Sequence, residues 1–278
     1  MKTNSITNHL LRRSQAVVGA IPALGACFVI IAALACTNVC RAAPGSGDKI
    51  IIGETTVVAD GTVATWARVN GEGKVIWVGL TIPLSMAENM PPRGSGPAGA
   101  VAVLNFPPVV QATTYFNHAE IHSQQAGHAN SGADPHRYRT PHFDFHFYGI
   151  PVANVRTIPG GLFFVDAPAD RLPEGYVQPE PFSVPQMGRH ARTLDEAAAT
   201  DHWLLTMFAG FLPDASYMHF IEPMITQEFL LLRKNFTLPV PMPATLGRAT
   251  SYPTECVVHY DEDADAYNIV FKGFEPIE

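Results

Sequence analysis

The stretch Pro141-His142-Phe143-Asp144-Phe145-His146-Phe147-Tyr148 carries the strongest structural signal in the sequence. Successive side chains of a β-strand point to opposite faces of a sheet. One face of this stretch would therefore carry Phe143, Phe145 and Phe147, and the other would carry His142, Asp144, His146 and Tyr148. We expect a strand that packs against a hydrophobic core on one side and presents metal-binding or proton-transferring groups on the other.

A second stretch with the same alternation precedes the first. In Asn117-His118-Ala119-Glu120-Ile121-His122, the side chains of His118, Glu120 and His122 would share one face, and smaller or apolar side chains would share the other. Two neighbouring strands of this kind would build one polar site above an apolar floor.

Short strand signals dominate the remainder of the chain. Asp60-Gly61 and Asn70-Gly71-Glu72-Gly73 are typical hairpin turns, so they favour antiparallel strands around them. Many prolines and a single clear helix, from a Thr226 cap to Lys234, argue against a helical fold. These signals predict one mostly-β domain over residues 43–278, a β-sandwich or partly open barrel with a few short helices. Strands are expected at residues 50–59, 62–69, 74–82, 100–106, 116–122, 202–211, 216–221, 255–260 and 266–274, short helices at 151–157 and 193–200, and a loop at 83–99.

Residues 1–42 have the composition of a secretory signal peptide. Lys2, Arg12 and Arg13 precede a long uncharged run rich in Ala, Val, Ile and Leu, and small residues follow this run. We expect cleavage after Ala42 and export to the periplasm or the extracellular space. The apolar run is also long enough to span a bilayer, so without cleavage it would anchor the protein in a membrane.

Charge and cysteine content narrow the function classes for the chain that remains after cleavage. Residues 1–42 hold four of the 18 Lys and Arg residues and none of the 25 acidic residues, which leaves a formal net charge of −11. Such an acidic protein, without a basic run, is a poor partner for nucleic acid or for anionic membrane surfaces. Of the four cysteines only Cys256 remains, so no intramolecular disulfide can form, and a metal site would need His and carboxylate ligands.

Six of the eleven histidines fall between His118 and His146, and this crowding predicts a metal site. Imidazole and carboxylate ligands suit zinc, which we expect first, and also manganese, iron or copper. His142 and His146, with His118 or Glu120 from the neighbouring strand, would supply three ligands and leave one coordination position open. Asp144 would be either a further ligand or the acceptor that orients an imidazole. The alternative is a metal-free polar face in which histidines are hydrogen-bonded to carboxylates.

Several other polar residues have roles that the sequence leaves open. These are His122, His128, His136 and His190, together with Glu222, which precedes a proline at the end of a predicted strand. Glu222 would cap the following helix, complete a metal site or act as a general base, and capping is favoured. The sequence contains no Gly-x-Ser-x-Gly, Walker or His-Glu-x-x-His motif, and no Gly-x-Gly-x-x-Gly that enters a helix. It therefore offers no motif for serine hydrolysis, nucleotide binding or zinc-protease chemistry.

Five short motifs lie within about residues 115–235: Pro141-His142-Phe143-Asp144-Phe145-His146-Phe147-Tyr148, His118-x-Glu120, Gly127-His128, Met187-Gly188-x-His190 and Glu222-Pro223-Met224-Ile225-Thr226. With these motifs the chain resembles the TTHB210-like family, a domain of unknown function in exported or envelope-associated bacterial proteins. The resemblance implies a ring-like homo-oligomer of β-rich subunits and no established reaction. The sequence departs from the family in the longer stretch between His128 and Pro141, which adds His136, and in the segment after His190.

The expected function is binding. We expect an exported, oligomeric envelope or stress-related protein that binds a metal through His and carboxylate side chains, with a small molecule as a candidate ligand. Binding is favoured because no nucleophile or general base stands apart from the expected metal ligands. The alternative is a metal-dependent hydrolase or oxidoreductase that acts on a small molecule, and the sequence does not decide whether the protein is an enzyme.

Overall fold

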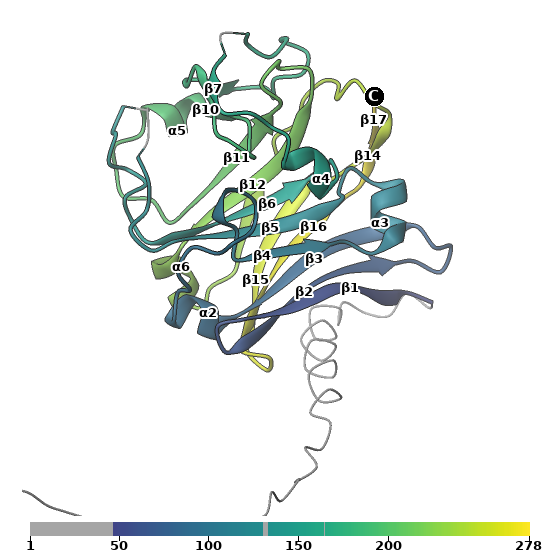
Figure 1. Ribbon diagram of the computed structural model, residues 1–278. Coiled ribbons are helices and arrows are strands. Elements are labelled where there is room, and N and C mark those ends of the chain that lie inside the picture. Colours follow the sequence, from purple (N-terminus) through teal and green to yellow (C-terminus); the bar gives the residue numbers. More distant parts are fainter. Residues whose placement is uncertain (1–46, 130–132, 164) are drawn as a thin grey trace, which may run out of the picture.

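The fold is built on two large antiparallel β-sheets (Figure 1). The computed structural model describes residues 47–129, 133–163 and 165–278, and the expected signal peptide at residues 1–42 lies outside these ranges. The six-stranded sheet contains, in spatial order, β1 (Lys49–Val58), β2 (Gly61–Val69), β3 (Val75–Pro83), β16 (Ala266–Lys272), β15 (Glu255–Asp261) and β13 (Phe236–Pro239). The seven-stranded sheet contains β4 (Ala102–Asn105), β5 (His118–Gln124), β6 (His142–Tyr148), β12 (Met218–Thr226), β11 (Leu205–Phe211), β10 (Arg189–Thr193) and β8 (Tyr176–Val177). Two small strand pairs join β14 (Thr250–Tyr252) to β17 (Glu275–Ile277), and β7 (Gly161–Leu162) to β9 (Phe182–Ser183).

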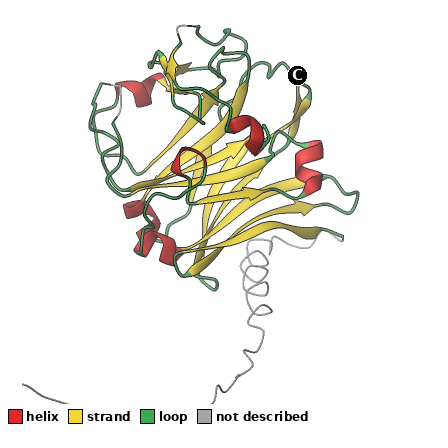
Figure 2. Cartoon of the chain, viewed as in Figure 1, coloured by secondary structure: helices red, strands yellow, loops and turns green. Residues whose placement is uncertain are grey.

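In the described residues, the helices between the strands are all short (red in Figure 2). They are α2 (Leu84–Glu88), the 3-10 helix η1 (Pro97–Gly99), α3 (Pro108–Thr113), α4 (Val152–Val155), α5 (Leu194–Ala198) and α6 (Gln227–Leu231). The predicted mostly-β fold with a few short helices is confirmed, and within the described residues neither large sheet closes into a barrel. Helix α2 lies where the sequence predicts a loop, because Leu84 and Met86 turn into the core. In the described part of the chain, no helix has the length and apolar character needed to cross a membrane.

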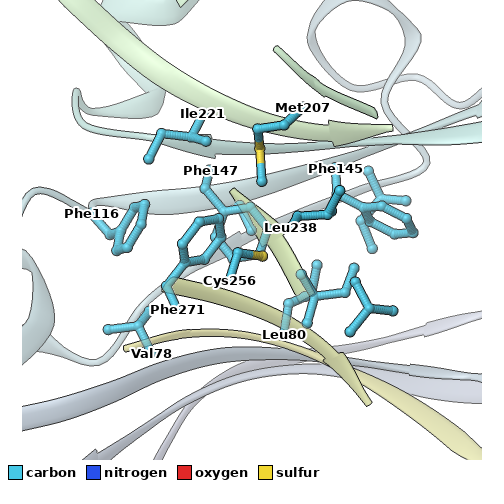
Figure 3. Close-up of a cluster of buried hydrophobic side chains, with 14 of the residues drawn as sticks. Val78, Leu80, Phe116, Phe145, Phe147, Met207, Ile221, Leu238, Cys256 and Phe271 are labelled. Carbon is cyan, nitrogen blue, oxygen red and sulfur yellow. The ribbon is translucent and has the colours of Figure 1, made fainter. Parts of the chain in front are cut away.

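The hydrophobic core lies between the two large sheets (Figure 3). Phe143, Phe145 and Phe147 of β6 all belong to it. The ring centroid of Phe271 in β16 lies 4.7 Å from that of Phe147 and 4.9 Å from that of Phe116. Buried aromatic rings in tilted contact stabilise a core through both apolar burial and ring-edge attraction. The predicted packing face of the 141–148 stretch is therefore confirmed.

Every residue of β6 is buried, including those on its polar face. β6 is a central strand, with β5 on one side and β12 on the other. Its Phe face is covered by the opposite sheet, and its polar face lies beneath two connecting segments that contribute Tyr138 and Met187, among other residues. The alternation expected for a half-exposed strand thus produces an internal polar site.

The helix capped by Thr226 is present but shorter than predicted. The Thr226 hydroxyl accepts a hydrogen bond from the Phe229 backbone N–H over 3.1 Å, which confirms the cap. The helix ends at Leu231, and the prediction that it continues to Lys234 is wrong. Arg233 has a φ of 55°, a left-handed conformation that stops an α-helix.

The strand predicted to end at Ile221 continues to Thr226 as β12. Pro223 lies inside it, although a proline removes one backbone donor and is rare in a central strand. Pairing with β6 is present on both sides of this position, at Ile221 and at Met224, so the strand tolerates the lost donor. This extension carries Glu222 into the sheet.

Candidate metal centre

Side chains from several strands of the seven-stranded sheet meet on the face turned away from the core. Residues paired across antiparallel strands point to the same side of a sheet. Glu120 of β5 lies opposite His146 of β6, and His122 lies opposite Asp144. β12, β11 and β10 extend this face on the other side of β6. The two polar faces predicted from the sequence therefore lie side by side.

The first group consists of His128, His142 and Asp144, whose candidate ligand atoms all lie within 4.8 Å of one another. Nε2 of His142 lies 3.1 Å from Oδ1 of Asp144. Nδ1 of His142 lies 2.6 Å from the Thr140 carbonyl oxygen, which can only accept, so Nδ1 carries the proton and Nε2 of the neutral ring can bind a metal. Gln124 donates to the other Asp144 oxygen over 2.9 Å. The first group thus has the outer hydrogen bonds that orient metal ligands.

His128 reaches the first group from the loop after β5. Its backbone N–H donates to the Tyr138 carbonyl over 2.9 Å. Gly127 has a φ of 63°, and a Cβ at this position would lie 2.0 Å from the same carbonyl oxygen. Glycine is therefore needed to place His128. His136, in the same loop, is exposed and lies outside the group.

The second group consists of His146 in β6, His190 in β10 and Glu222 in β12, again with all candidate ligand atoms within 4.8 Å of one another. Nε2 of His146 lies 3.4 Å from Oε1 of Glu222, and Nε2 of His190 lies 3.6 Å from Oε2. Both ring nitrogens of His146 and Oε2 of Glu222 are buried without a hydrogen-bond partner in the described residues. Buried polar atoms without partners are rare and costly, so this arrangement indicates a ligand site.

Burial shifts the pKa values of the second group toward its uncharged forms. Burial and the neighbouring His122 lower the pKa of His146 well below its usual value, and burial lowers the pKa of His190 to about 4. Burial and the negative charge of Asp144 raise the pKa of Glu222 well above its usual value. At neutral pH both imidazoles are therefore neutral, and Glu222 holds its proton to a higher pH than an ordinary glutamate does. A bound cation would favour release of the Glu222 proton.

The first group contains a charged pair instead. Burial alone would lower the pKa of His142, but the Asp144 carboxylate outweighs burial and raises this pKa. Burial alone would raise the pKa of Asp144, but His142 holds it well below its usual range. A metal ion that binds His142 would displace the proton from this ring, so metal binding at either group is coupled to proton release.

His118, Glu120 and His122 form a polar row beside the two groups. Oε1 of Glu120 lies 3.3 Å from Nε2 of His118, and Oε2 lies 3.5 Å from Nε2 of His122. Burial alone would raise the pKa of Glu120, but the two histidines lower it. The His118 ring stacks on Tyr148 with a centroid separation of 4.8 Å. His118 and Glu120 are hydrogen-bonded to each other, whereas Oε2 of Glu120 and Nε2 of His122 are buried without a hydrogen-bond partner in the described residues.

The five residues expected to bind metal are divided among these clusters. His142 and Asp144 lie in the first group, and His146 lies in the second. His118 and Glu120 lie in the polar row and, in the described residues, belong to neither group of three. The sequence indicates one shared site, whereas the structure shows two neighbouring groups along β6.

Three residues with roles left open by the sequence complete the groups, namely His128, His190 and Glu222. The preference for Glu222 as a helix cap is wrong, because the Thr226 hydroxyl caps α6 and Glu222 lies inside β12. Residues 218–226 show no regular alternation of polar and apolar side chains, because His219, Glu222 and Thr226 are three and four residues apart, so no local signal placed Glu222 on the site face.

Comparisons of the chain with models of known families, with curated proteins and with solved structures give no match. The resemblance to the TTHB210-like family therefore stays a prediction. The chemistry of the site has to be inferred from its geometry.

Both groups open onto one cavity of about 750 Å³. His128 and Asp144 line it from the first group, and His190 and Glu222 line it from the second. Much of the remaining wall is apolar and includes Phe182, Val184, Met187, Phe208 and Met224. This volume and this mixture of apolar walls with a few polar groups are typical of small-molecule sites.

Each group offers two imidazoles and one carboxylate. This donor set binds zinc in hydrolytic enzymes and iron(II) in oxygenases, and in both cases coordination positions stay open for water or substrate. Here the open positions would face the cavity, because residues of both groups line it. The arrangement can therefore bind a cation and present it to a small molecule.

Proposed function

We propose that this protein binds divalent transition-metal ions in the two groups and holds a small molecule in the adjoining cavity. The second group carries the proposal, because His146, His190 and Glu222 converge from three strands with buried nitrogen and oxygen atoms that have no hydrogen-bond partner in the described residues. A metal ion would give these atoms a partner, and the cost of burying them would be offset.

Zinc is the expected ion. It accepts imidazole and carboxylate ligands without a demanding geometry, and a three-ligand site with an open position is typical of catalytic zinc. Iron(II) is the next candidate, since two histidines and one carboxylate are its ligands in oxygenases, and manganese and copper share the same donors.

The first group would hold a second ion. Asp144 and His146 are two residues apart on β6, a spacing of about 7 Å along a strand. Metal ions in bridged pairs are about 3.5–4 Å apart, so we propose two neighbouring ions instead of one bridged pair. The expected stoichiometry is two ions per chain.

Elemental analysis of the protein purified without a His tag tests this proposal. Wild type should contain two equivalents of metal after dialysis, Glu222→Gln should retain one, and Glu222→Gln combined with His142→Ala should retain none. His219→Gln is the matched control, because His219 is a buried histidine of β12 that lies in neither group and should retain both ions. No stoichiometric metal in wild type, and no change in melting temperature with chelator or added Zn²⁺, would overturn the proposal.

A metal-dependent hydrolase or oxidoreductase is the second candidate. It is favoured by the position of His190 and Glu222 in the cavity wall, where a metal with an open coordination position would meet a ligand. Metal-loaded wild type should be assayed with aryl esters, aryl phosphates and dioxygen-dependent oxidations beside Glu222→Gln. Turnover that requires both the metal and Glu222 would establish an enzyme, whereas metal and ligand binding without turnover would support a binding protein.

The proposal includes export and self-association. Export is supported by the signal-peptide composition of residues 1–42, and a homo-oligomer is supported by the resemblance to the TTHB210-like family. N-terminal sequencing of secreted protein tests cleavage after Ala42. Light scattering coupled to size-exclusion chromatography tests the oligomer.

A further inference from the structure

Arg192 is a buried arginine in the wall of the same cavity. It is two residues after His190 in β10, so both side chains lie on one face of the strand. Its Nη1 lies 2.8 Å from Oε1 of Glu180, and its Cζ lies 5.5 Å from the ring centroid of Phe208. These two contacts hold the guanidinium group in place with 2% of the residue exposed.

The other edge of this guanidinium group is unpaired. Nε and Nη2 are buried and donate to no acceptor among the described residues. These two nitrogens lie on one edge of the planar group, where two parallel N–H bonds match the two oxygens of a carboxylate or phosphate. Burying charged donors without acceptors is costly, so this edge indicates a binding site for an anion.

Other buried arginines of the chain show what this edge binds when it is occupied. Nε and Nη2 of Arg137 donate to the two carboxylate oxygens of Glu196, over 2.7 and 3.2 Å. Nε and Nη2 of Arg68 both approach Oδ2 of Asp48. In each case the Nε–Nη2 edge holds a carboxylate of the protein itself, whereas Arg192, a residue of the cavity wall, has no acceptor at this edge among the described residues.

The rest of the cavity restricts the anion. Phe208, Met187 and Met224 are apolar wall residues that would cover a hydrocarbon body. Asp144 and Glu180 are acidic wall residues, which disfavour a doubly charged group such as a phosphate monoester. A singly charged carboxylate on an apolar body fits both the apolar wall and the acidic wall residues.

We propose that the Nε–Nη2 edge of Arg192 binds the carboxylate of a small organic acid whose apolar body fills the cavity beside the metal groups. This assignment rests on the proposed function in taking the cavity as the ligand site, but it does not require that metal be bound.

Calorimetric titration of the metal-free protein tests the assignment with benzoate, phenylacetate and hexanoate, each beside its neutral amide, and with phenyl phosphate. At least one carboxylate should bind at least about tenfold more tightly than its amide, which is the effect of a charge-assisted hydrogen-bond pair. It should also bind more tightly than phenyl phosphate. No carboxylate binding at up to about 10 mM, or equal binding of acid and amide, would overturn the assignment. Preference for phenyl phosphate would also overturn it.

Two variants and one control test whether Arg192 is the residue that binds the carboxylate. Arg192→Lys keeps the charge beside Glu180 but removes the planar edge, and it should weaken carboxylate binding at least about tenfold. Arg192→Gln combined with Glu180→Gln removes the ion pair without leaving a lone charge, and it should have the same effect. Arg189→Lys is the control, because Arg189 is a buried arginine of β10 outside the cavity wall. Unchanged affinity in both Arg192 variants would overturn the assignment.

Metal content measured on the same samples separates the two proposals. Arg192-dependent carboxylate binding by a chain that takes up no metal would leave this inference standing and overturn the proposed metal function. Two bound ions per chain, with no preference of the cavity for carboxylates, would overturn this inference and leave the proposed metal function standing.

Discussion

Nε2 of His146 and Oε1 of Glu222 lie 3.4 Å apart between β6 and β12, and both side chains are buried. Two opposite charges at this distance would shift the two pKa values toward the charged forms. Here burial outweighs that attraction, so the pKa of His146 is lowered and the pKa of Glu222 is raised. Burial therefore favours the uncharged forms of both candidate metal ligands, and one substitution should affect stability and metal binding in opposite directions.

We expect Glu222→Gln to stabilise the metal-free protein at pH 8. An acid with a raised pKa keeps its proton in the folded chain above pH 4.5, its usual value, whereas the unfolded chain loses it there. The contribution of Glu222 to the free energy of unfolding of wild type therefore falls as pH rises above 4.5. Glutamine resembles the protonated acid and removes this loss, so the melting temperature at pH 8 should rise by at least about 2 °C.

Thermal unfolding in the presence of chelator, at pH 4.5 and at pH 8, measures this effect. The gain from Glu222→Gln should be larger at pH 8 than at pH 4.5, and the same variant should lose one metal equivalent. An equal loss of stability at both pH values would show that Glu222 is ionised in the metal-free protein and would contradict the prediction.

Acid should destabilise the metal-free protein through His219, a buried histidine outside both groups. Burial lowers the pKa of His219 to about 3, although its Nε2 donates to the Met187 carbonyl over 2.6 Å. The unfolded chain takes up this proton below its usual pKa of 6.5, and the folded chain does not take it up until about pH 3. Stability is therefore present above pH 6.5 and is lost as pH falls, by about 1.4 kcal/mol per pH unit for this residue.

Urea unfolding of wild type and His219→Gln at pH 6, 5 and 4, with chelator present, tests this linkage. The variant should lose about 1.4 kcal/mol less per pH unit than wild type. His136→Gln changes an exposed histidine and should leave the pH dependence unchanged. Identical slopes for wild type and His219→Gln would mean that the folded chain accommodates the charged ring.

The polar and apolar faces of β5 and β6 could be predicted because each strand carries its whole pattern in consecutive residues. His142, Asp144 and His146 alternate with phenylalanines, and this alternation fixes the side to which each points. The convergence of His190 and Glu222 on His146 could not be predicted in the same way. It depends on the spatial order of β6, β12, β11 and β10, which arises from long-range pairing and has no local signature.

Gly127, directly before His128, should affect metal binding at the first group and leave metal binding at the second group unchanged. Gly127 has a left-handed φ of 63°, and a Cβ there would lie 2.0 Å from the Tyr138 carbonyl oxygen, so Gly127→Ala must displace the loop that carries His128. Metal content should fall from two equivalents to one. Gly175→Ala is the matched control, since Gly175 also has a positive φ, of 76°, but a Cβ there meets no atom within 4 Å. Gly175→Ala should retain two equivalents, and equal metal loss in both variants would point to a general effect of backbone strain.

Phe147 tests whether the two faces of β6 are independent. It follows His146 in sequence, yet its ring lies in the core, 4.7 Å from the ring of Phe271 and 5.7 Å from that of Phe116. Phe147→Ala should lower the free energy of unfolding by about 3–5 kcal/mol, because it removes a buried ring and leaves a cavity. Phe147→Leu retains most of the apolar volume and should cost about 1–2 kcal/mol. Both values follow from urea unfolding at pH 7.

The Leu variant should still bind two metal equivalents, since the backbone register that places His146 beside Glu222 is set by strand pairing and not by the ring of Phe147. Metal loss from folded Phe147→Leu protein would show instead that core packing positions the ligands.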